Sequence, residues 1–105
     1  MNASASFRFL GISEQLSKDL KLVAPEADFG VHYQSGKQVG CIELINQSSV
    51  KAIEEFYNKH CFKPTDCDIF ISIASGKRDE VWRAPKLVNH VIHSINCPIV
   101  FSYTC

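Results

Sequence analysis

Two spacings of apolar residues alternate along this chain, and they constrain its fold more than any other feature of the sequence. Residues 3–9 alternate Ala or Phe with other side chains, and this period of two indicates a strand. Residues 14–23 instead carry their apolar residues at i, i+4 and i+7, the spacing of one helix face, with Ser13 as an expected cap and Pro25 as the stop. The chain must therefore form strands that share a sheet and helices that cover it.

The same two patterns recur towards the C-terminus. Strands are predicted where apolar residues alternate or form a β-branched run, at residues 29–33, 39–45, 69–73 and 99–103. Helices are predicted at residues 48–60 and from Pro85 to just before Pro98, where the apolar positions form continuous stripes. The resulting order is βαββαβαβ.

This order predicts one α+β domain over residues 1–105, because no linker, repeat or low-complexity tract divides the chain. We expect a single-layer, mainly antiparallel, five-stranded sheet with the helices packed on one face. The first six elements have the order of a ferredoxin-like unit, followed by an extra helix and strand. This likeness concerns element order only and implies no function, because such folds host many functions.

The charge and cysteine content restrict the classes of partner. Among the 105 residues, 11 basic and 11 acidic side chains give no net charge, so strong non-specific binding to nucleic acid is not expected. Nothing approaches the roughly 18 consecutive apolar residues of a membrane-spanning helix, and no membrane partner is expected. The five cysteines are odd in number and form no Cys-x-x-Cys pair, which predicts free thiols, a reducing compartment and a cytoplasmic location.

The polar stretch 75–83 is the most suggestive candidate for a binding site. Lys77, Arg78 and Arg83 supply positive charge before a helix N-terminus, and Trp82 supplies an apolar platform. The four residues could therefore hold an anionic ligand. The alternative is a solvated loop with Trp82 against the sheet, because two acidic residues within the stretch offset much of its charge.

A weaker candidate lies on the last predicted helix. His90, His93 and Cys97 are spaced at i, i+3 and i+7, and all three residue types bind zinc. Pro98 disfavours helical geometry at Cys97, however, and the sequence fixes no fourth ligand. We therefore expect this face to be a polar surface that meets water, or a subunit contact, and we expect neither a metal nor a cofactor.

The remaining cysteines do not predict a thiol enzyme. Cys61 follows His60 near a predicted helix C-terminus, where the helix dipole disfavours a thiolate. Cys67 begins an apolar strand and is expected to behave as a small hydrophobic residue. No catalytic residue is therefore assigned.

The function expected from the sequence is that of a small binding or interaction module without catalytic machinery. Its last predicted strand, residues 99–103, alternates Ile, Phe and Tyr and could lie at a sheet edge, which favours a homodimer or a protein partner. One alternative is a domain that binds a small anionic molecule, or a minor enzyme, with a pocket near residues 75–83. A basic patch for nucleic acid, formed by Lys77, Arg78, Arg83 and Lys86, ranks third.

Overall fold

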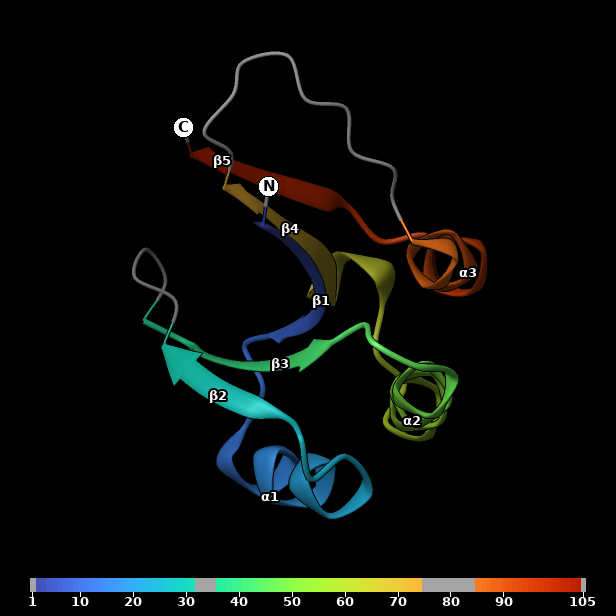
Figure 1. Ribbon diagram of the computed structural model, residues 1–105. Helices are drawn as coiled ribbons and strands as arrows, with labels where there is room; N and C mark the ends of the chain where they lie inside the picture. Colours follow the sequence, from blue (N-terminus) through green and yellow to red (C-terminus); the bar gives the residue numbers. More distant parts are fainter. Residues whose placement is uncertain (1, 32–35, 75–84, 105) are drawn as a thin grey trace.

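A single five-stranded sheet with the strand order β2-β3-β1-β4-β5 organises the protein (Figure 1). The structure is a computed structural model that describes residues 2–31, 36–74 and 85–104. Its elements are β1 (Asn2–Leu10), α1 (Glu14–Val23), β2 (Asp28–Val31), β3 (Gln38–Glu43), α2 (Gln47–Lys59), the 3-10 turn η1 (Pro64–Asp66), β4 (Cys67–Ala74), α3 (Lys86–Ile95) and β5 (Ile99–Thr104).

The sheet is mixed, and this corrects the expectation of a mainly antiparallel one. β3 pairs with β1 and β2 in antiparallel fashion, and β1 pairs with β4 in the same way. β5 instead runs parallel to β4, because α3 lies between the two strands in sequence and carries the chain back to the starting end of β4. The element order also differs slightly from the predicted one, since η1 precedes β4.

All three helices lie on the same side of the sheet (Figure 1). The strands turn alternate side chains towards them, so that Phe7 and Phe9 of β1 are fully buried. The rings of Phe9 and Phe56 pack edge to face, with their centres 5.2 Å apart, and this contact joins β1 to α2. The largest fully buried side chains are those of Phe7, Phe9, Leu20, Ile42, Ile53, Ile69, Ile71, Val50, Val88, Val91 and Cys67.

Side-chain caps fix the starts of two helices. The Leu16 amide donates a 3.1 Å hydrogen bond to Ser13 Oγ, which confirms the predicted cap of α1. The Ser49 amide donates in the same way to Asn46 Oδ1 at the start of α2. At the other end of the fold, α3 stops at Ile95 because Asn96 adopts the left-handed conformation with φ 52°. No helix in the described ranges is long and apolar enough to cross a membrane.

Candidate functional site

The sheet face opposite the helices carries a row of polar side chains that crosses four strands. Asp28 on β2 is the cross-strand partner of Cys41 on β3, and Cys41 is the partner of Arg8 on β1. Arg8 in turn lies opposite Asp68 on β4. Cross-strand partners turn their side chains to the same face, so the sheet lines up these four groups although they are distant in sequence.

The centre of this row is an ion pair with two parallel hydrogen bonds. Arg8 Nε donates to Asp68 Oδ1 at 2.7 Å, and Arg8 Nη2 donates to Oδ2 at 2.6 Å. The Arg8 guanidinium carbon also lies 4.6 Å from the centre of the Phe70 ring. The hydrogen bond to Asp68 raises the pKa of Arg8 above its ordinary value. The guanidinium is therefore held in one position, with its charge balanced by Asp68.

The Cys41 thiol in the same row is suited to packing rather than to nucleophilic chemistry. Burial raises the pKa of Cys41, and this effect outweighs the opposing effects of a hydrogen bond with Ser6 and of the Arg8 charge. A thiol with a raised pKa stays protonated near neutral pH, and the protonated form is not the nucleophile. Cys41 therefore adds a neutral, weakly polar wall to this face.

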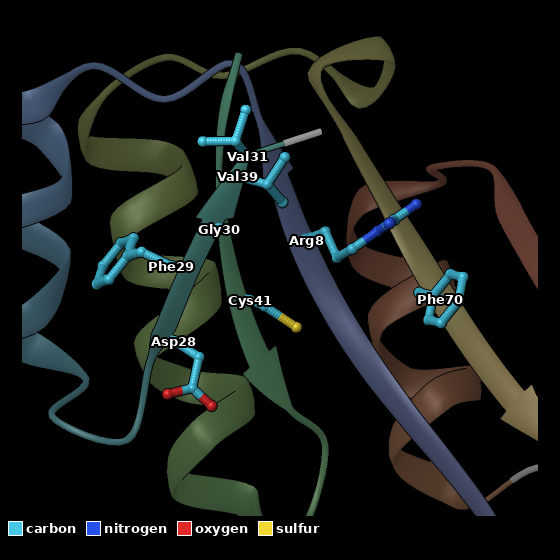
Figure 2. A pocket seen from close by; sticks show the side chains of 8 residues that line it. All are labelled: Arg8, Asp28, Phe29, Gly30, Val31, Val39, Cys41 and Phe70. Carbon is cyan, nitrogen blue, oxygen red and sulfur yellow. The ribbon is translucent and has the colours of Figure 1, made fainter. Parts of the chain in front are cut away.

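A cavity of about 480 Å³ lies on this sheet face, which we call the open face because it is opposite the helices (Figure 2). We refer to it as the open-face cavity. Figure 2 shows the side chains of Asp28 and Cys41 on neighbouring strands, with the Phe29 ring pointing away from them. Gly30 leaves open space, because a Cβ atom added there would meet nothing within 4 Å. The cavity is lined by Arg8, Asp28, Phe29, Gly30, Val31, Val39, Cys41 and Phe70. Its volume lies in the range of small-molecule sites, and its lining combines apolar side chains with charged ones.

A smaller hollow of about 200 Å³ lies between α1 and α2 and has different chemistry. It is lined by Asp19 of α1 and by Glu55, Lys59 and His60 of α2 and its end, among others. His60 Nε2 is buried and has no hydrogen-bond partner, while the imidazole packs 4.5 Å from the ring of Phe56. Nowhere in the described residues do three metal-binding side chains come together.

The residues that the sequence singled out for anion binding, Lys77, Arg78, Trp82 and Arg83, lie outside the described residues. Their role stays a prediction. The open-face cavity is lined by other residues, which the sequence patterns did not predict as a site. The sequence signal for this site is limited to two charged residues, Arg8 and Asp68, each of which interrupts an apolar strand.

The structure separates the three weak metal candidates. His90 Nε2 lies 3.3 Å from Glu54 Oε1 on α2, and both His90 and His93 are exposed. Cys97 is only 6% exposed, which corrects its predicted place on the face that meets water. The reason is that Asn96 ends the helical path one residue earlier, so Cys97 turns into the core.

The cysteines considered for thiol chemistry are placed as packing groups or at the surface. Cys67 is buried, and burial raises its pKa to about 12. Cys61 is exposed and follows the C-cap of α2 with φ 56°. His60, the residue before it, packs against the ring of Phe56.

A second surface of interest is the edge strand β5. Phe101 is 64% exposed and Tyr103 53%, and Ile99 and Val100 are exposed as well. β5 is paired with β4 along one edge, and no described strand pairs with its other edge. The strand, with the sequence IVFSYT, contains no charged residue.

The open-face cavity and the β5 edge are thus two surfaces of the described residues on which binding can be argued from several features together. Comparisons of the chain with protein-family models, with curated proteins and with solved structures find no match.

Proposed function

We propose that this protein is a self-associating binding module in which a second copy of the chain pairs with β5. The observation that carries the proposal is an edge strand of six residues with large exposed apolar side chains and no charge. Adding a strand to an exposed sheet edge forms main-chain hydrogen bonds along the edge. It also buries exposed apolar side chains such as those of Ile99 and Phe101.

The two edge strands of the sheet, β2 and β5, differ in the features that protect an edge from pairing with another strand. Edge strands that stay unpaired are commonly short, charged or interrupted by proline. β2, at the opposite edge, has four residues and carries Asp28. β5 has none of these protective features between Ile99 and Thr104. The β5 edge is therefore the better surface for strand addition.

A second copy is the partner that fits β5 by symmetry. In an antiparallel two-fold pairing centred on Phe101, that residue lies opposite its own copy, and Ile99 lies opposite Tyr103. Aromatic pairs and pairs of aromatic with β-branched residues are the favourable cross-strand combinations. The chain has no net charge, so two copies do not repel each other strongly. Two-fold dimers are also the commonest oligomers.

The test is the mass in solution of the wild type and of two matched variants at about 50 µM, in the range of moderate affinities. Light scattering coupled to gel filtration should give twice the 11.8 kDa mass of one chain for the wild type. Phe101→Lys places a charge in the proposed interface and should give a monomer. Val31→Lys makes the same kind of change at the other edge, where Val31 is 70% exposed, and should stay dimeric.

Two results would overturn the proposal. One is a wild-type protein that is monomeric at this concentration, and the other is a dimer that Val31→Lys dissociates and Phe101→Lys does not. Circular dichroism of each variant checks that the fold is retained, so that loss of the dimer is not confused with unfolding.

The proposed role requires no catalysis, and we place the module in the cytoplasm. The support for this location is that Cys41, Cys61, Cys67 and Cys97 are free thiols. Free thiols persist in reducing compartments.

A further inference from the structure

One charged group of the open-face cavity, the exposed carboxylate of Asp28, has no counter-ion among the described residues. Arg8 is occupied by Asp68, and their charges cancel. Cys41 is neutral because burial raises the pKa of its thiol. Asp28 also lines the cavity, and its carboxylate forms no ion pair or hydrogen bond with any residue in the described ranges. The cavity therefore favours a cation over an anion.

An anionic ligand would meet an unfavourable arrangement here. To bind Arg8 it would have to compete with a carboxylate that already accepts two short hydrogen bonds and whose side chain is only 7% exposed. It would also lie near the Asp28 carboxylate. Both effects weaken the binding of an anion, and the second strengthens the binding of a cation.

The space beside Asp28 is apolar. Gly30 follows Asp28 two residues later on the same face of β2, and it leaves the space above the strand open. Val39, the cross-strand partner of Gly30, forms the adjoining wall. A ligand with a charged end and a short apolar body would thus meet a carboxylate at one end and an aliphatic surface at the other.

We propose that this cavity binds a small amphipathic amine, with its ammonium group at Asp28 and its apolar body over Gly30 and against Val39. This site is separate from the β5 edge and does not depend on dimer formation. It uses Arg8 and Asp68 as a fixed, neutral boundary rather than as ligand-binding groups.

The experiment is a titration of the ¹⁵N-labelled full chain with three probes of matched shape. The probes are 2-phenylethylamine, which is a cation near neutral pH, the neutral 2-phenylethanol, and the anion phenylacetate. The amine at up to about 10 mM should shift the amide signals of Asp28, Gly30, Val39 and Cys41, whereas phenylacetate should not. The alcohol should bind more weakly than the amine.

Three variants locate the site. Asp28→Asn keeps the shape and removes the charge, and it should weaken amine binding about tenfold, the value of one charge-assisted contact. Gly30→Val fills the open space and should abolish binding of the amine. Glu43→Gln removes an exposed carboxylate from the same face outside the cavity and should leave binding unchanged.

The proposal fails if no probe shifts the four amides, if phenylacetate binds at least as tightly as the amine, or if Asp28→Asn binds the amine as the wild type does. Thermal unfolding of each variant shows whether it is folded. Should Gly30→Val be unfolded, the comparison of Asp28→Asn with Glu43→Gln decides the question alone.

Discussion

Arg8 and Asp68 face each other across β1 and β4 and are joined by two hydrogen bonds of 2.7 and 2.6 Å on the sheet face that no described helix covers. The side chains are 19% and 7% exposed, so the pair is largely removed from water. Each charge depends on the other, because an isolated charge at such a position has lost hydration without replacement. The pair also ties together the two strands at the centre of the sheet.

Removing one partner of this pair should cost much more than removing both. Asp68→Leu leaves the Arg8 charge without its counter-ion, and we expect the free energy of unfolding to fall by about 3 kcal/mol. The double variant Arg8→Met with Asp68→Leu should recover most of this loss, because neither charge remains. Urea denaturation of the single and double variants measures the coupling.

Glu43→Leu is the matched control for this change. Glu43 is an exposed acid on the same face. Its replacement by leucine should change the free energy of unfolding by only about 0.5 kcal/mol. If Asp68→Leu costs no more than Glu43→Leu, the pair has no special role in stability.

The elements of the fold were predictable because each depends on a local pattern. The alternation in residues 3–9 became β1, and the Ser13 cap became the start of α1. The direction of β5 was not predictable in the same way. Pairing of β5 with β4 depends on where α3 returns the chain, and no local spacing encodes this path. The end of α3 was expected close to Pro98, but Asn96 ended it earlier through its left-handed backbone.

The candidate site was not predictable from the sequence because its residues meet only across strands. Asp28, Cys41 and Arg8 come from three separate segments, and the register of the sheet alone makes them neighbours. Sequence motifs report groups that are close along a helix, a strand or a loop.

Replacing Gly40 of β3 or Gly30 of β2 by alanine should change the stability of the protein in different directions. A Cβ at Gly40 would lie 3.0 Å from Leu20 Cδ2 and 3.3 Å from Phe29 Cε1, so Gly40→Ala should destabilise the protein by about 1–3 kcal/mol. Gly30→Ala meets open space and should be neutral or stabilising by about 0.5 kcal/mol. Thermal unfolding of the two variants gives the comparison, and equal losses for both would show that the packing of Leu20 against β3 is not as described.

The buried thiols should make stability fall in alkaline solution. Burial raises the pKa of Cys67 to about 12 and that of Cys97 to about 11, from an ordinary 9.0. In the unfolded chain these thiols lose their protons near pH 9.0, whereas in the folded protein they retain them up to the higher values. Their contribution is therefore fully present below pH 9.0 and is lost as the pH rises towards 11 and 12, by on the order of 1 kcal/mol per thiol for each pH unit.

Urea denaturation between about pH 8 and pH 11 measures this loss against a variant without the two thiols. The variant Cys67→Ala with Cys97→Ala should be less stable than the wild type at the lower pH, because two buried sulfur atoms are removed from the core. Its stability should then fall less steeply with pH, so that the difference between the two proteins narrows in alkaline solution. Parallel curves for the two proteins would contradict the raised pKa values, since other ionisations affect both proteins equally.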